Sequence, residues 1–99
     1  RTADMAGRYG GDEFCVILPD LPLNRAAAVM DALCDRFATL GYKQNPALKV
    51  SLSIGLAAYQ VHFTQAHMWL NAADQALYAA KGTGRNRVTV AESRIARSA

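Results

Sequence analysis

Two adjacent carboxylates, Asp12 and Glu13, follow the double glycine Gly10-Gly11 and precede the apolar run from Phe14 to Leu18. This run, bounded by turn residues, predicts a strand buried on both faces. Carboxylates at the mouth of such a strand are costly to desolvate unless a positive charge lies beside them. The pattern therefore predicts that a cation accompanies Asp12 and Glu13, and the alternative is a solvated hairpin turn, in which Gly and Asp are common.

Two basic residues form a second candidate group near the end of the chain. Lys81 is expected in the last turn of a helix, and Arg85 follows it by four residues in a glycine-flanked turn. Both can reach one polyphosphate, lysine as a point charge and arginine as a planar fork. The alternative for Lys81 is that it only complements the negative end of the helix dipole.

The elements that must position these groups are readable in the hydrophobic pattern. Met5 to Tyr9 can form a short strand, and Gly10-Gly11 is expected to supply the positive φ angles of a tight hairpin turn. From Pro22 to Leu40 apolar residues recur at spacings of three and four, which predicts an amphipathic helix. Gly41 is the expected stop of that helix.

The second half of the chain predicts a strand, a helix and a strand. Val50 to Tyr59 alternates bulky and small residues, so one face of this strand lets a helix or a ligand come close. Thr64 is the expected cap of a helix that runs through Lys81, and Arg87 to Val90 is a plausible final strand. The order of elements indicates an α/β sandwich with helices packed on a sheet.

Composition limits the classes of protein to consider. The 99 residues, of which 52% are hydrophobic and 19% charged, suit one small globular domain. No apolar run approaches the roughly 20 residues that cross a bilayer, and no secretory signal is present, so we expect a cytoplasmic domain without direct membrane contact. The start at Arg1, without an initiator Met, suggests a piece of a longer polypeptide.

Cysteine and charge patterns exclude further kinds of site. Cys15 and Cys34 lie in apolar patterns and are expected to be buried, reduced thiols. The net charge of +3 is concentrated near the end of the chain, which fits a ligand that carries phosphate. No aromatic residues interleave with these charges, so a nucleic-acid-binding domain is the weaker alternative and nucleic acid is not an expected partner.

Four segments together carry a resemblance to a known family. Residues 10–14, GGDEF, resemble the signature of the GGDEF family of diguanylate cyclases, and residues 50–55, 73–81 and 84–88 resemble later segments of the family in the same order. The resemblance implies a fold related to the palm of nucleotidyl cyclases and polymerases. Residues 1–90 correspond to the C-terminal portion of the domain and 91–99 to a tail. The first strand and next two helices of the family, which bring a further metal-binding Asp and the guanine contacts, precede this point.

The activity that the resemblance implies is condensation of two GTP into cyclic di-GMP and pyrophosphate. Asp12 and Glu13 match the carboxylates that hold Mg²⁺ or Mn²⁺, and Asp12 also matches a possible acceptor of the 3′-hydroxyl proton. Gly10 and Gly11 would let the nucleotide approach the backbone. Lys81 and Arg85 match positions that hold the terminal phosphates. The family works as a homodimer, with a sensory domain elsewhere in the parent chain.

The first residues resemble a regulatory site of the same family. Arg1 and Asp4 form an RxxD pattern at the offset where many members bind cyclic di-GMP as a feedback inhibitor. Because the upstream contacts are missing, we expect residues 1–99 alone to be inactive. The alternative function is a non-catalytic GGDEF module that acts as a cyclic di-GMP receptor or GTP sensor.

Overall fold

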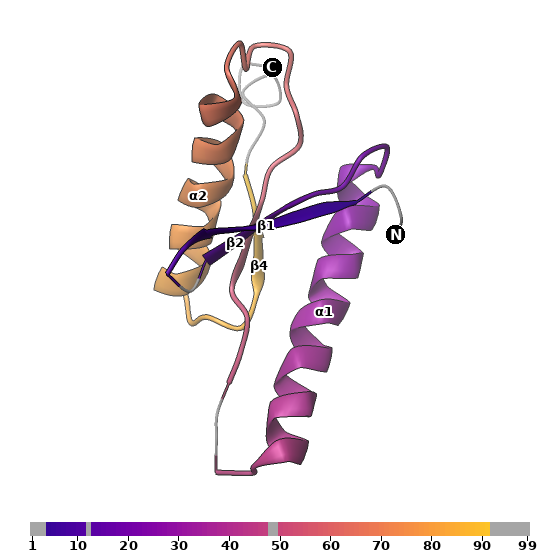
Figure 1. The fold of residues 1–99 in the computed structure, drawn as a ribbon, viewed down its shortest axis with the longest axis vertical. Helices are drawn as coiled ribbons and strands as arrows, with labels where there is room; N and C mark the ends of the chain where they lie inside the picture. Colours follow the sequence, from indigo (N-terminus) through magenta and orange to yellow (C-terminus); the bar gives the residue numbers. More distant parts are fainter. Residues whose placement is uncertain (1–3, 12, 48–49, 92–99) are drawn as a thin grey trace.

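The computed structural model describes residues 4–11, 13–47 and 50–91, and it has the predicted order of hairpin, helix, strand, helix, strand (Figure 1). The elements are β1 Met5–Gly10, β2 Glu13–Ile17, α1 Leu23–Gln44, β3 Ile54–Leu56, α2 Ala66–Gly82 and β4 Val88–Val90. The α/β class is therefore confirmed. None of the described helices is long and apolar enough to cross a membrane.

Strands β1 and β2 form the predicted antiparallel hairpin. Met5 pairs with Ile17 and Arg8 with Phe14, and the register then shifts so that Gly10 pairs with Glu13. The predicted positive φ angles at Gly10 and Gly11 are wrong, because neither residue has left-handed backbone. The strand register is irregular next to the turn, and the chain reverses direction there without a positive φ angle at either glycine.

The prediction that β2 is buried on both faces is also wrong. Exposure alternates along the strand, and Phe14 is 71% exposed while Cys15 and Ile17 are half-buried. This alternation is typical of a strand with only one covered face. The apolar run signals a strand correctly, but it does not show which face is covered.

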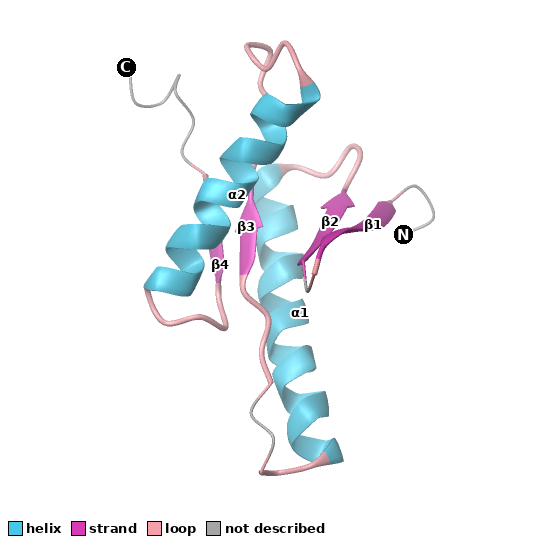
Figure 2. Cartoon of the chain, turned by 60° about the vertical axis from the view of Figure 1, so that its left-hand side comes forward, coloured by secondary structure: helices cyan, strands magenta, loops and turns pink. Residues whose placement is uncertain are grey.

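Strands β3 and β4 form a parallel pair, and α2 is the crossover helix that connects them. Helix α2 packs on this pair (Figure 2). A Cβ added to Gly55 in β3 would collide with the backbone of α2 at Ala73 and Leu77. The small residue predicted to admit a helix or a ligand therefore admits α2.

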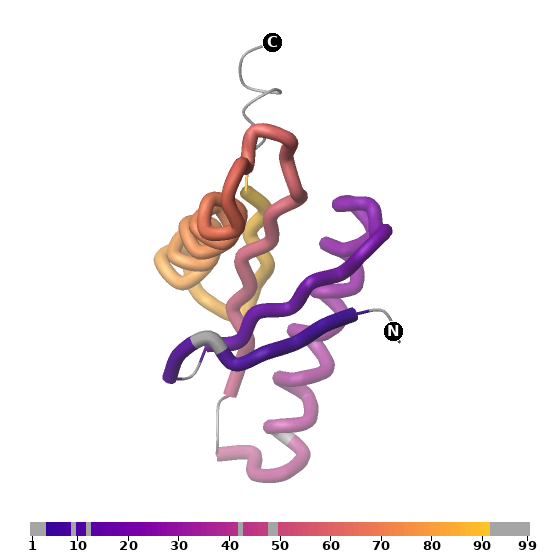
Figure 3. Tube along the Cα trace, turned by 45° about the horizontal axis from the view of Figure 1, so that its top comes forward, coloured from indigo at the N-terminus to yellow at the C-terminus, as the bar shows by residue number. Residues whose placement is uncertain are grey.

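The strand predicted from Val50 to Tyr59 is shorter than expected, since only Ile54–Leu56 pairs with β4. Its partner also has only three residues, which limits the ladder. Among the described residues the sheet consists of two separate two-stranded pieces, β1–β2 and β3–β4. Figure 3 shows α1 and α2 on either side of β3 and β4, with the hairpin crossing in front of this pair in that view.

Helix α1 passes through Gly41 and ends at Gln44, so the predicted stop is wrong. A Cβ added to Gly41 would collide with the side chain of Val50. The glycine therefore marks a close approach between α1 and the segment before β3. About two turns earlier in α1, the Cys34 thiol donates to the Leu52 carbonyl at 3.5 Å and ties α1 to the same segment.

The start of α2 is held by Trp69 and not by the predicted cap. The cap position is Gln65, without a side-chain capping bond, while the Thr64 hydroxyl contacts the Met68 sulfur at 3.5 Å. The Trp69 indole N–H donates to the Ala57 carbonyl at 2.8 Å, and its ring packs edge-on against Tyr59. These contacts fasten the first turns of α2 to the chain that leaves β3.

The core of the described residues is built from small side chains. The buried apolar residues are Ala26, Cys34, Ala76 and Ala80. Large apolar side chains on one side of α1 stay exposed, although the apolar side of an amphipathic helix is expected to be covered. They are Val29, Leu33, Phe37 and Leu40. An exposed apolar stripe of this kind, together with Phe14 and Val16, is typical of a surface that another segment or subunit covers.

Replacing Gly55 with alanine tests the contact between β3 and α2. We expect Gly55→Ala to lower the free energy of unfolding by about 3 kcal/mol, because backbone of α2 must move to admit the methyl group. Gly7→Ala is the matched control, since a Cβ there meets nothing within 4 Å. Urea unfolding followed by the fluorescence of Trp69, the single tryptophan, measures both. Equal stability of the two variants would contradict the close packing.

The thiol of Cys34 makes a pH-dependent contribution to stability. Burial raises the pKa of Cys34 above its ordinary value of 9.0, and the nearby Asp31 and Asp35 raise it further. The folded state thus holds the proton more tightly than the unfolded state, so this contribution is complete below pH 9 and is lost as the pH rises above it. We expect the unfolding free energy to fall more steeply above pH 9 in the wild type than in Cys34→Ala. Parallel pH profiles would refute this role.

Candidate functional site

The hairpin turn leaves open space around its two glycines. Nothing lies within 4 Å of a Cβ built on Gly10 or Gly11, and neither residue has a positive φ. Within the described structure, neither conformation nor packing requires glycine at these positions. The small residues instead leave room for a bound molecule to approach the backbone.

The structure describes only one of the two predicted carboxylates, Glu13. Glu13 is the first residue of β2, is half-buried and pairs with Gly10. Asp12 lies outside the described residues. Glu13 therefore stands at the mouth of the strand, as predicted, at the edge of the open space beside the glycines.

Arg8 is a further candidate for the site, which the sequence analysis does not single out. Its Nε and Nη2 donate to the Gly11 carbonyl at 3.0 and 2.7 Å, and Nε also lies 3.4 Å from the Gly10 carbonyl. The guanidinium thus holds both glycines and brings a positive charge to the turn that carries the carboxylates. A basic residue two positions before the double glycine was the available signal.

The second candidate group lies at the end of α2. Lys81 is half-buried in the last turn, and the Thr83 N–H and hydroxyl both donate to the Ala79 carbonyl. Gly84 follows with φ 128°, and the Arg85 N–H donates to the Ala80 carbonyl at 2.9 Å. This bond and the left-handed glycine are the features of a Schellman helix end, so the helix stops where the sequence predicts.

Arg85 and Asn86 continue in left-handed backbone, with φ of 60° and 48°. Non-glycine residues adopt this conformation at a cost and need support from their surroundings. Arg85 is exposed, and its guanidinium makes no hydrogen bond to other described residues. Among the described residues the turn therefore presents a guanidinium without a hydrogen-bond partner, four positions after the lysine in the last turn of α2.

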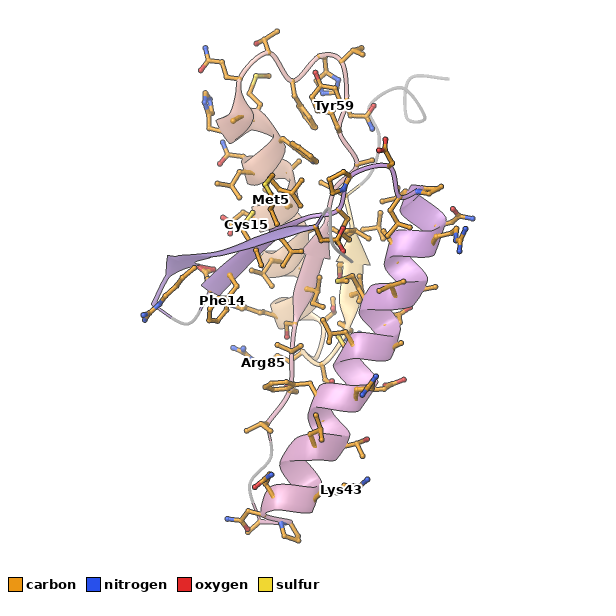
Figure 4. All side chains as sticks on the ribbon, turned by 45° about the vertical axis from the view of Figure 1, so that its right-hand side comes forward. Met5, Phe14, Cys15, Lys43, Tyr59 and Arg85 are labelled. Carbon is orange, nitrogen blue, oxygen red and sulfur yellow. The ribbon has the colours of Figure 1, made fainter. Side chains whose placement is uncertain are left out.

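The two groups lie toward the same side of the molecule in Figures 1 and 3. Figure 4 shows Arg85 on the hairpin side, well away from Lys43 at the end of α1. No hydrogen bond within the described part of the chain joins the hairpin turn to the end of α2. The described residues also include no cluster of three or more His, Cys, Asp or Glu that could hold a metal.

The predicted inhibitory pair is described only in part. Asp4 is half-buried and precedes β1, at the open end of the hairpin, whereas Glu13 lies at the turn. Arg1 lies outside the described residues. Binding of cyclic di-GMP by this pair therefore stays a prediction, although Asp4 is separated from the candidate active site by the length of β1.

Sequence comparisons identify similar proteins over nearly the whole chain. A family model described as "Diguanylate cyclase, GGDEF domain" matches residues 1–87. Probable diguanylate cyclase DgcC of Escherichia coli K12 is 38% identical over 91 residues, which are 92% of this chain and 24% of that protein. Diguanylate cyclase A of Treponema denticola is 34% identical over 96 residues, 96% of this chain and 26% of that protein. The chain thus spans about a quarter of these relatives.

Solved structures show the same fold. The GGDEF domain of DgcB from Caulobacter crescentus, crystallised in complex with c-di-GMP, matches with a TM-score of 0.81 and 32% identity. The match covers 94% of this chain and 56% of that one. The active GGEEF domain of a diguanylate cyclase from Vibrio cholerae also gives a TM-score of 0.81, at 28% identity, over 91% of this chain and 57% of that one.

The strain at Arg85 predicts opposite effects of glycine at two positions. Because Arg85 has φ 60°, we expect Arg85→Gly to be more stable than Arg85→Ala by about 1 kcal/mol. At the exposed helical residue Arg36, the order should reverse, with alanine about 1 kcal/mol more stable than glycine. Urea unfolding of the four variants measures this. The same order at both positions would contradict the left-handed turn.

Proposed function

The chain belongs to the GGDEF family of diguanylate cyclase domains, and we propose that the protein containing it condenses two GTP into cyclic di-GMP and pyrophosphate. The observation that carries the proposal is the open hairpin turn. Its glycines are required neither by φ nor by neighbouring atoms, and Gly10 pairs across the hairpin with the acidic residue Glu13. Space for a ligand and an acidic group at one turn suit a nucleotide bound with a cation.

The residues present fit a magnesium or manganese ion in donor chemistry. Carboxylate oxygens are the ligands that these hard cations take, and Glu13 stands half-buried at the edge of the open space. We propose that Asp12 and Glu13 hold Mg²⁺ or Mn²⁺ there. When bound, the ion would neutralise charge on the triphosphate and favour attack on it.

The reaction needs two such steps: in each, the 3′-oxygen of one GTP joins the α-phosphorus of the other and the bond from that phosphorus to the pyrophosphate oxygen breaks, so that two pyrophosphates leave. In the proposal, Asp12 accepts the 3′-hydroxyl proton, and the backbone at Gly10 and Gly11 lets the nucleotide lie close. Lys81 and Arg85 bind the terminal phosphates, which leave as pyrophosphate, so their positive charges stabilise the leaving group.

Two like domains must face each other in this reaction, because each binds one GTP and the product has twofold symmetry. We therefore propose a homodimer as the catalytic form. Since the chain is about a quarter of the length of its relatives, we assign the sensory domain to other parts of the protein. We also propose a cytoplasmic location, which GTP as the proposed substrate supports, and we expect residues 1–99 alone to be inactive.

Regulation by product is the next part of the proposal. We propose that Arg1 and Asp4 bind cyclic di-GMP and reduce the activity of the distant hairpin turn. The position of Asp4, at the end of β1 opposite to Gly10, supports a site separate from the catalytic one. Arginine and carboxylate groups suit the phosphates and the guanine edge of this ligand.

A non-catalytic receptor for cyclic di-GMP is the second candidate function. The match to a GGDEF domain crystallised with c-di-GMP favours this possibility. The intact pair Asp12-Glu13 favours the enzyme, because a receptor has no chemical need for two carboxylates at the open turn.

Turnover of GTP by the natural full-length protein tests the catalytic proposal. With Mg²⁺, we expect cyclic di-GMP as the product, and we expect Glu13→Gln and Asp12→Asn to lower kcat roughly 100-fold or more by removing charge that holds the cation. Asp35→Asn, at an exposed position of α1, is the matched control and should retain activity. Anion-exchange chromatography resolves the products. No product from the wild type, with cyclic di-GMP still bound, would support the receptor.

A further inference from the structure

We propose that Ser53 and Arg87 are positioning residues that hold the Gly84–Asn86 turn so that Arg85 faces the terminal phosphates of GTP. This inference rests on the phosphate-binding role proposed above for Arg85. Ser53 and Arg87 are not themselves proposed to contact phosphate. Both contact the backbone of the turn, one from the segment before β3 and one from the residue before β4.

The turn is a strained segment that needs support. Gly84, Arg85 and Asn86 have φ of 128°, 60° and 48° in succession. Glycine adopts such angles freely and asparagine tolerates them, but arginine does so at a cost that neighbouring groups must offset. Strain of this kind tends to collect at functional sites, where surrounding contacts maintain it. The direction of the Arg85 side chain depends on this backbone.

Ser53 supplies the first support. The backbone N–H of Asn86 donates to the Ser53 hydroxyl oxygen at 3.2 Å, across 33 positions in the chain. The next residue, Ile54, donates its own N–H to the Arg87 carbonyl at 2.9 Å. Asn86 and Arg87 are therefore bonded to two consecutive residues, Ser53 and Ile54. These two residues lead directly into Gly55, which contacts α2.

Arg87 supplies the second support. Its Nε donates to the Arg85 carbonyl at 3.1 Å. Its guanidinium also lies against Gly84, so that a Cβ at that glycine would collide with it. The Arg87 side chain thus closes over the turn and bonds to the residue whose side chain must stay free. The guanidinium of Arg87 thus bonds to the turn itself, whereas the guanidinium of Arg85 makes no hydrogen bond to other described residues.

Binding of the α,β-methylene analogue of GTP to the natural full-length protein tests the inference. By calorimetry with Mg²⁺, we expect Arg85→Ala and Ser53→Ala each to weaken binding about tenfold. In the Arg85→Ala background, Ser53→Ala should weaken binding less than about twofold, because it acts through Arg85. Ser53→Thr keeps the hydroxyl and should bind as the wild type does. Circular dichroism of each variant reports whether it folds.

Arg87 provides an independent variant in case Ser53→Ala does not fold. Arg87→Lys keeps the charge but loses Nε, and we expect it to weaken binding as much as Arg87→Ala. Unchanged affinity in folded Arg87→Lys would overturn the support assigned to Arg87. An equal effect of Ser53→Ala with and without Arg85 would overturn the positioning role of Ser53 while the proposed function stands. Unchanged affinity in Arg85→Ala would instead overturn the phosphate role and this inference with it.

Discussion

The direct contact between Gly55 and the backbone of α2 is the constraint on which the rest of the arrangement depends. Only glycine at this point of β3 allows Ala73 and Leu77 to lie against the strand. The contact sets where α2 lies on the parallel pair, and α2 in turn carries Lys81 and the turn with Arg85. The end of the candidate site that is proposed to bind phosphate is therefore placed by a packing contact whose residues in α2, Ala73 and Leu77, precede Arg85 along the chain.

Local signals predicted the elements well, and contacts distant in sequence account for the errors. The hairpin, both helices and β4 follow from periodicity and turn residues. Gly41 was read as a helix stop, but the same residue type also serves where another segment packs closely, here Val50. The number of β3 residues that pair depends on the length of β4, and the face of β2 that is covered depends on tertiary packing. Neither property can be predicted from the local sequence.

Some residues of the candidate site can be predicted from local sequence, and others are seen only in the structure. Glu13, Lys81 and Arg85 are predicted from the sequence because each belongs to a short motif whose residue types indicate its chemistry. The sequence does not single out Ser53, because its hydroxyl meets Asn86 from 33 positions away, or Arg87, because its bond to a nearby carbonyl leaves no sequence signature. Arg8 does have a local signal, since it lies two positions before the double glycine. Motifs thus identify the groups proposed to meet the nucleotide, while the structure reveals the groups that hold them.

We propose that the hairpin turn and the end of α2 bind one nucleotide between them. A crystal structure of the natural full-length protein with Mg²⁺ and the α,β-methylene analogue of GTP tests this arrangement. We expect the metal at the carboxylates of Asp12 and Glu13 and the terminal phosphates of the same molecule at Lys81 and Arg85. A nucleotide bound elsewhere, or one that contacts the hairpin but leaves Lys81 and Arg85 in solvent, would contradict it.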